Sequence, residues 1–260
     1  MTRLIPLLAT GVLFVGLAAC GSTAGEPVPS GASPSGDAAS ATDSPSPAAS
    51  PTPDKATQCP TATVGEVDPE EIVSARANIF GAGHNVAPDP EGGGGGVLPP
   101  VRMLPAGAVR TLTFPSVTGC VTPIDGMAGW NGPAGDSGDF GGTNVESYDG
   151  IAGLVWGGSG MFLTGVFLGD EEPSDPAPER LVYTRGPGDL TAVTKPEIGQ
   201  TFYIGDGVDS KTQALRRYQV PAEATRLFLG FVDSYLYVGD PGWYGNNRGQ
   251  LHVVTHVDVE

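Results

Sequence analysis

Short runs of β-branched and aromatic residues recur from residue 109 onward, and Gly, Pro, Asp or Asn interrupts them. Forty glycines and 25 prolines among 260 residues leave few stretches in which a long helix can form. Such runs are typical of strands, and no helical stretches alternate with them. The expected strands are 109–114, 117–122, 152–156, 161–168, 181–183, 200–204, 215–220, 226–232 and 250–258. This pattern predicts an all-β fold, an antiparallel β-sandwich of jelly-roll type.

The last expected strand alternates most clearly. Its residues fall on two faces, one with Leu251, Val253, Thr255 and Val257, the other with His252, Val254, His256 and Asp258. Side chains four apart on a strand are about 13 Å apart, so the two histidines cannot share one metal ion. We expect both to be surface residues.

One short N-terminal helix is expected, over residues 69–80. Asp68 suits the N-cap, Pro69 suits the first helical position, and apolar residues then recur at helical spacing. Residues 85–100 follow as a loop or hinge, with an unbroken run of glycine from Gly92 to Gly96.

The first twenty residues have the pattern of an export signal. A single Arg3 precedes an apolar stretch, residues 4–16, that is too short to span a bilayer. The Leu-Ala-Ala-Cys-Gly sequence around Cys20 resembles the bacterial lipobox, in which the cysteine is acylated. Residues 1–20 are therefore expected to be a lipoprotein signal peptide; an ordinary signal peptide cleaved at a small residue is the alternative.

The expected domains follow from composition. Residues 21–57 are rich in Ser, Pro and Ala and contain no aromatic residue, which is typical of a disordered spacer. Residues 58–260 are long enough for one β-sandwich domain. We expect this domain to be held on the extracytoplasmic face of the cell membrane by the lipid anchor.

Charge and cysteine content restrict the partners. The formal charge is −16 with only 13 Lys and Arg, which argues against nucleic acid and against attraction to anionic lipid. Membrane contact is therefore expected through the anchor alone. Cys59 and Cys120 are the thiols other than Cys20, and an oxidising compartment favours a disulfide between them. Two separate buried thiols are the alternative.

Motifs typical of enzymes are weak, and we do not expect an enzyme. Gly135-Asp136-Ser137-Gly138 resembles the serine region of trypsin-type proteases, but no histidine has that family's sequence context. The acidic loop 170–175 could attract a cation, although a solvated loop is the usual meaning of such a run.

The loop between the last two expected strands is rich in oxygen donors. Asp233 ends one strand, and Asn246 and Asn247 precede the next. Calcium prefers six to eight oxygen ligands from carboxylates, amides and main-chain carbonyls. Asparagine also tolerates the left-handed backbone that lets neighbouring side chains converge. A calcium site is one interpretation, and a simple tight turn at Asn246–Gly249 is the other.

The segment Tyr244–Leu251, which reads Tyr-Gly-Asn-Asn-Arg-Gly-Gln-Leu, resembles the C-terminal calcium loop of PA-I type galactose-binding bacterial lectins. Those lectins are β-sandwiches related to the galactose-binding-like domains. Pro221–Phe231 and Ala106–Val109 resemble two of their strands.

The resemblance implies that calcium is held by five groups. These are the side chains of Asp233, Asn246 and Asn247, the main-chain carbonyl of Trp243, and a carbonyl near Cys120. In those lectins sugar hydroxyls complete the shell of the ion. The resemblance thus implies a carbohydrate ligand, galactose-like in the first instance.

The chain departs from the lectins in several places. The path from Asp233 to Trp243 is longer, so Asp240 is an alternative carboxylate ligand. Trp243 replaces a threonine, and with Tyr244 it can either stack on a sugar ring or plug the loop against the sandwich. Trp130 or Asn131 would have to replace the sugar-reading loop.

We therefore expect a calcium-dependent, lectin-like carbohydrate-binding domain with ligand contacts from Asp233, Trp243, Tyr244 and Asn246. The alternative is a calcium-stabilised structural or adhesion domain of the cell envelope that binds a protein partner.

Overall fold

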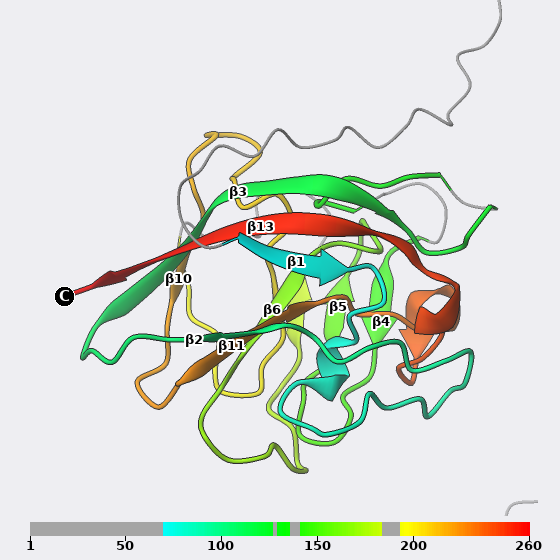
Figure 1. Cartoon of the computed structure of the whole chain (residues 1–260), viewed down its shortest axis with the longest axis horizontal. Helices are drawn as coiled ribbons and strands as arrows, with labels where there is room; N and C mark the ends of the chain where they lie inside the picture. Colours follow the sequence, from blue (N-terminus) through cyan, green and yellow to red (C-terminus); the bar gives the residue numbers. More distant parts are fainter. Residues whose placement is uncertain (1–69, 127–128, 136–140, 184–192) are drawn as a thin grey trace, which may run out of the picture. The chain divides into compact units, whose positions relative to one another are not determined.

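Three sheets form the framework of the structure (Figure 1). The computed structural model describes residues 70–126, 129–135, 141–183 and 193–260. These residues contain thirteen strands and three one-turn 3-10 helices. The helical turns are η1 (Ile79–Gly81), η2 (Tyr235–Tyr237) and η3 (Tyr244–Asn246).

The first sheet has five strands in the order β1-β13-β3-β10-β8. All neighbours are antiparallel except the parallel pair β10 and β8. Figure 1 shows β3, β13 and β1 side by side. The strands are β1 (Glu70–Ser74), β13 (Arg248–Val259), β3 (Arg110–Thr122), β10 (Arg217–Gln219) and β8 (Val193–Thr194).

The second sheet is wholly antiparallel and has the order β2-β11-β6-β9. Its strands are β2 (Val101–Met103), β11 (Arg226–Gly230), β6 (Thr164–Leu168) and β9 (Phe202–Tyr203). The third sheet has the order β12-β4-β5-β7, with β12–β4 and β5–β7 parallel. Its strands are β12 (Val238–Gly239), β4 (Thr143–Val145), β5 (Leu154–Trp156) and β7 (Leu181–Tyr183).

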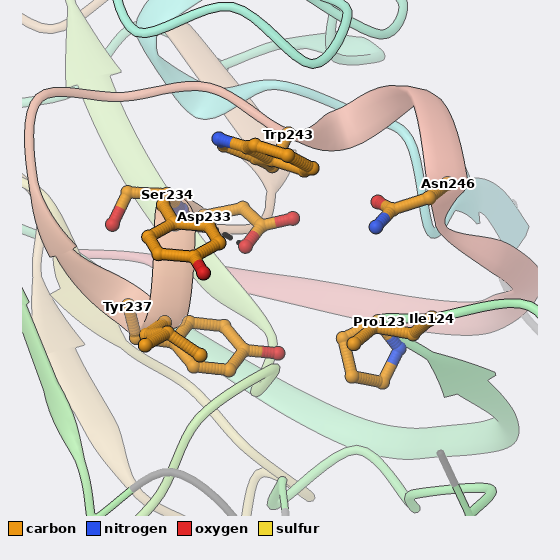
Figure 2. Close-up of a pocket in the computed structure, with 9 residues that line it drawn as sticks. Pro123, Ile124, Asp233, Ser234, Tyr237, Trp243 and Asn246 are labelled. Carbon is orange, nitrogen blue, oxygen red and sulfur yellow. Dashed lines mark hydrogen bonds between the residues drawn. The ribbon is translucent and has the colours of Figure 1, made fainter. Parts of the chain in front are cut away.

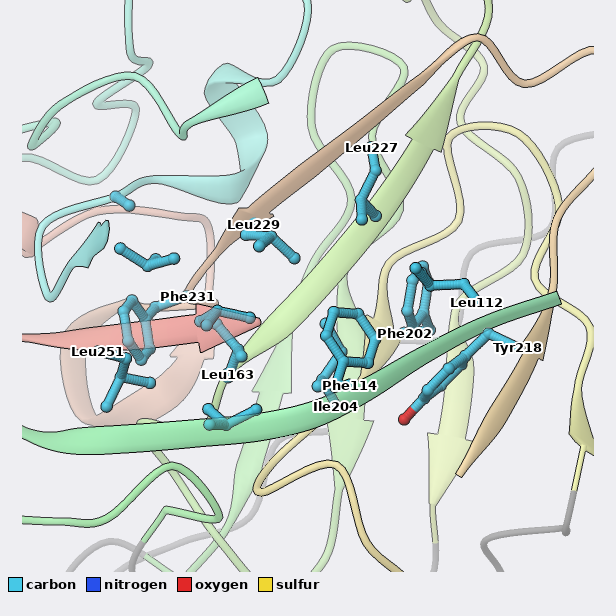
Figure 3. Packing of buried hydrophobic residues seen from close by; sticks show 14 of the residues in the cluster. Leu112, Phe114, Leu163, Phe202, Ile204, Tyr218, Leu227, Leu229, Phe231 and Leu251 are labelled. Carbon is cyan, nitrogen blue, oxygen red and sulfur yellow. The ribbon is translucent and has the colours of Figure 1, made fainter. Parts of the chain in front are cut away.

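The second sheet is the middle layer, because its strands contribute to two separate apolar clusters. Phe202 and Leu227 join Leu112, Phe114 and Leu251 of the five-stranded sheet (Figure 3), and Phe167 belongs to the same cluster. The adjacent residues Val166, Tyr203 and Phe228 join Val145 and Leu154 of the third sheet. Alternate residues of a strand point to opposite faces, so β6, β9 and β11 bury side chains on both faces. All five residues of β6 are accordingly buried.

The sequence-based prediction of an all-β antiparallel sandwich is confirmed. Most of the expected strands are present, and the described residues contain almost no helix. The alternation predicted for the last strand is also observed: Leu251, Val253 and Thr255 are buried, while His256 and Asp258 are exposed. Within the described part of the chain, no helix is long and apolar enough to cross a bilayer.

The predicted helix over residues 69–80 is wrong. Residues 70–74 form β1, which pairs with β13 through contacts such as Val73 with Leu251. Ile72 is 56% exposed and Val73 is fully buried, the alternation of a strand rather than a helix. Pairing with a long neighbouring strand outweighs local helix signals here. The expected cap residues Asp68 and Pro69 lie outside the described residues.

The two strands predicted on either side of Pro115 are one continuous strand, β3. The register with β13 shifts between Val254 and His256, opposite Pro115. Proline lacks a backbone donor, so it is tolerated within a sheet at such an irregularity. A proline in an apolar run therefore does not have to end the strand.

Burial of the middle sheet on both faces gives a stability test. Phe167→Ala and Phe228→Ala, one on each face, should each lower the free energy of unfolding by about 3–5 kcal/mol. Val182→Ala, on an exposed position of β7, should cost less than about 1 kcal/mol. Urea unfolding measures all three. A Phe228→Ala cost as small as that of Val182→Ala would contradict packing between the second and third sheets.

Candidate functional site

A pocket of about 300 Å³ lies beside the chain segment that connects β11 to β13. Figure 2 shows the Asp233 carboxylate pointing into the space bounded by Trp243 and Asn246. Most of the wall comes from this one segment, and the rest follows β3. The lining residues are Pro123, Ile124, Asp233, Ser234, Tyr235, Leu236, Tyr237, Trp243 and Asn246.

Backbone strain is concentrated at this pocket. Among the described residues, six that are not glycine have a positive φ angle, and three of the six line the pocket. They are Leu236 at 55°, Tyr237 at 58° and Trp243 at 67°. A left-handed backbone costs about 1–2 kcal/mol for a residue with a side chain. Such conformations persist where the fold enforces them, and they cluster at binding sites.

Asp233 is the buried acid of the pocket. It lies three residues beyond the end of β11 and is only 3% exposed. The Ser234 amide donates to Oδ1 at 2.9 Å, and the Asn247 side-chain amide donates to Oδ2 at 2.7 Å. Burial raises the pKa of Asp233 to about 8; these two hydrogen bonds oppose the rise, and the charge of Glu91 adds to it. None of the nine lining residues is basic.

Tyr244 fixes the position of Asp233 from the core side. Its hydroxyl donates to the carbonyl of Phe231 at 2.9 Å and accepts from the amide of Asp233 at 3.0 Å. The Tyr244 ring is fully buried. Of the two roles considered for Tyr244, the structure therefore shows the plug against the sandwich and leaves no ring face for a ligand.

Among the described residues, two buried amide oxygens in the segment after Trp243 have no hydrogen-bond partner. They are Oδ1 of Asn246 and Oδ1 of Asn247. The Asn247 nitrogen donates to the carbonyl of Ala75 at 3.1 Å as well as to Asp233. Buried polar atoms are nearly always paired, so these two oxygens are acceptors that a cation or a donor group of a ligand could satisfy.

The donor set fits a cation that prefers oxygen. Asp233 and Asn246 line the pocket and supply a carboxylate and an amide oxygen. If the Asn247 side-chain amide were rotated by 180°, its oxygen would take the place beside Asp233 that its nitrogen has now. Within the described residues no group of three or more His, Cys, Asp or Glu side chains is placed to hold a metal. A cation here would thus depend on amide and main-chain oxygens, as calcium sites often do.

The pocket also presents aromatic surface. The rings of Tyr235 and Trp243 are 5.1 Å apart at an angle of 44°. Tyr235 is 54% exposed and Trp243 is partly exposed, so both can be reached by a ligand. The site therefore combines one buried carboxylate, unpaired amide oxygens and an aromatic wall.

Cys120 does not join this cluster. It lies within β3 opposite Gln250 and is disulfide-bonded. The pocket residues from this part of the chain are Pro123 and Ile124, just beyond the end of β3. Cys59, its predicted disulfide partner, and Cys20, the predicted lipidation site, lie outside the described residues.

Three other residues considered for the site lie outside the pocket. Asp240 is exposed, so Asp233 is the carboxylate that faces the amides. Trp130 is 43% exposed and packs close to Gly249, where a Cβ would lie 2.7 Å from its ring. Asn131 pairs with the backbone of Val121.

Three acidic side chains of the loop 170–175 contact other parts of the protein. Asp170 accepts from Thr225 at 2.7 Å, and Asp175 accepts from the amide of Gly150 at 3.0 Å. Glu172 lies 3.1 Å from a ring nitrogen of His84. The serine motif at residues 135–138 lies largely outside the described residues.

The two histidines of the last strand are apart, as predicted. His252 contacts Glu70 at 3.1 Å, and His256 contacts Asp258 at 3.1 Å. Each histidine therefore has its own acidic neighbour on the surface of the sheet.

Sequence reasoning missed the residues between Asp233 and Asp240 that line the pocket. Ser234, Tyr235, Leu236 and Tyr237 follow the acid directly, and the aromatic pair in this run was the available signal.

No family model matches the chain, and a search of curated proteins finds no match either.

With chelator present, the wild type should lose stability as the pH rises, and Asp233→Asn should not. Between the ordinary pKa of 3.8 and about 8, folded Asp233 keeps its proton while the unfolded chain releases it. The free energy of unfolding should therefore fall as pH rises through this window, by several kcal/mol, and level off above it. Urea unfolding at pH 5 and pH 8 measures the fall. Asp240→Asn, in the same segment but exposed, should behave like the wild type. If stability still falls with pH in Asp233→Asn as in the wild type, Asp233 is not the group that titrates.

Proposed function

We propose that this protein is a lipid-anchored, extracytoplasmic carbohydrate-binding protein whose ligand enters the pocket beside Asp233 and whose binding depends on calcium. One observation carries the proposal. Aromatic rings that a ligand can reach stand next to a buried carboxylate and to buried amide oxygens with no partner.

A sugar suits this combination of groups. A pyranose ring has apolar C–H faces and a rim of hydroxyls. Tyr235 and Trp243 offer large apolar faces, while Asp233 and Asn246 offer acceptors for hydroxyl protons. Binding pockets generally combine an apolar wall with a few convergent polar groups.

Calcium suits the polar end. Asp233, Asn246 and Asn247 would hold the ion through side-chain oxygens, with the Trp243 carbonyl as a further ligand from the resemblance to PA-I type lectins. The ion supplies positive charge that orients adjacent sugar hydroxyls. It would also satisfy Asp233, which has no basic neighbour in the pocket wall.

A second candidate function is adhesion through protein contacts, with calcium as a structural ion. It is favoured by the apolar rim next to the pocket, where Leu236 and Val238 are at least half exposed. Exposed apolar side chains beside a pocket offer contact area to a protein partner.

Trp243→Ala should weaken sugar binding by about fivefold, because a ring contact of this kind is worth about 1 kcal/mol. A glycan array in calcium identifies the sugar, and calorimetry measures the affinity. Trp130→Ala, at an exposed tryptophan outside the pocket, is the matched control and should bind like the wild type. A blank array in calcium would favour the adhesion candidate.

Calcium should raise the melting temperature of the wild type and leave that of Asp233→Ala unchanged. A ligand at 100 times its dissociation constant stabilises the folded state by about 2.7 kcal/mol. Thermal melts with calcium and with chelator measure the difference. Equal wild-type melting temperatures in the two conditions would remove the calcium site.

A further inference from the structure

The glycine run predicted to be a loop or hinge is fixed against the pocket. We call residues Glu91–Gly96 the glycine segment. The amide of Trp243 donates to the carbonyl of Gly92 at 2.8 Å, and the amide of Gly245 donates to the carbonyl of Gly93 at 3.2 Å. The amide of Glu91 donates to the carbonyl of Pro241 at 3.3 Å. Three backbone hydrogen bonds thus join the glycine segment to the pocket segment.

Gly93 lies directly against the Trp243 side chain. A Cβ atom on Gly93 would lie 2.7 Å from Cδ2 of the indole and 2.8 Å from its Cα. Real Cβ contacts are essentially never that short, so a side chain at Gly93 would displace the indole or the backbone that carries it. Trp243 can therefore occupy its observed position only because residue 93 has no side chain.

Gly92 offers a contrast one residue away. Its φ is +90° and that of Gly93 is +79°, so alanine meets similar backbone strain at both positions. Nothing lies within 4 Å of a Cβ built on Gly92. The two positions differ in whether a methyl group would contact Trp243.

Glu91 holds the other aromatic residue. Its Oε2 accepts from the backbone amide of Tyr235 at 2.7 Å. Tyr235 precedes Leu236 and Tyr237, whose left-handed backbone needs support from neighbouring groups. Glu91 thus fixes the start of the strained turn that carries the second ring of the wall.

The glycine segment is anchored to the protein core at its other side. The fully buried Asn78 donates from its amide nitrogen to the carbonyls of Pro88 at 2.9 Å and Gly95 at 3.0 Å. Asp89 accepts from the amide of Gly94 at 3.1 Å. The glycine segment therefore connects the core rigidly to the pocket.

We propose that Gly93 and Glu91 are positioning residues of the ligand pocket: Gly93 sets the place of the Trp243 ring, and Glu91 sets the place of Tyr235. The proposal rests on the proposed function for its effect on ligand affinity. Its effect on ring position is independent of any ligand.

The first test compares Gly93→Ala with Gly92→Ala in the full-length protein without ligand. The indole N–H resonance of Trp243, assigned by its loss in Trp243→Phe, reports the ring position by NMR. Gly93→Ala should shift this resonance and leave those of Trp130 and Trp156 in place, whereas Gly92→Ala should leave all three unchanged. A Trp243 resonance that stays in place in Gly93→Ala, or moves equally in both variants, would overturn the assignment of Gly93.

The same pair is then titrated with methyl galactoside and with the sugar that the glycan array selects, in calcium. Gly93→Ala should bind about fivefold more weakly than Gly92→Ala, as expected for loss of one aromatic contact. A wild type that binds no sugar would refute the proposed function and leave the resonance comparison to decide the positioning role. Equal affinities alongside a shifted resonance would show that the ring position does not control binding.

Glu91 is tested by a conservative pair. Glu91→Gln keeps an oxygen that can accept from Tyr235, and Glu91→Ala does not. Because Tyr235 lies 5.1 Å from Trp243, only Glu91→Ala should shift the Trp243 indole resonance. Equal spectra for the two variants would refute the positioning role of Glu91.

Discussion

Burial of β6, β9 and β11 on both faces is the constraint on which the rest of the structure depends. Each face of this middle sheet belongs to a different apolar cluster, so consecutive residues of these strands are almost all buried. A buried polar side chain within these strands needs a partner there, as Thr164 has in the carbonyl of Gly230, so the chain places a carboxylate only after it leaves the sheet. It leaves β11 at Gly230, and Asp233 is the first acid that follows. The position of the pocket is a consequence of where the middle sheet ends.

The pocket joins segments that are far apart in the chain. The Asn247 amide bridges Asp233, which follows β11, to the carbonyl of Ala75, which follows β1. Tyr244 ties the same acid to Phe231. These contacts lie at the junction between the five-stranded and middle sheets. A ligand bound at Asp233 would therefore stabilise the contact between two layers as well as its own loop, because binding to the folded state alone raises stability.

The all-β class and most strands could be predicted from sequence, and the resemblance to PA-I type lectins brought Asp233 together with Asn247, which donates to it. Period-two patterns and the position of polar residues between strands are local signals. The failed helix at 69–80 had good local signals but was overruled by pairing of β1 with β13, which lies 180 residues away in the chain. The role of Gly93 was beyond sequence reasoning because its partner is Trp243, 150 residues later. The sequence shows only a run of glycines, and the structure is needed to show that the Trp243 side chain packs directly against Gly93.

The pocket is held in a conformation that the isolated segment would not adopt. Leu236, Tyr237 and Trp243 have left-handed backbones, and Asp233 is buried without a basic partner in the pocket wall. Each feature is unfavourable by itself, so the surrounding hydrogen bonds from Tyr244, Asn247 and the glycine segment must maintain it. A site already held in its binding geometry loses less conformational entropy when ligand arrives. The unfavourable conformation is consequently a further physical reason, besides the aromatic rings and the unpaired amide oxygens, to propose that this loop is a binding site rather than a connection between strands.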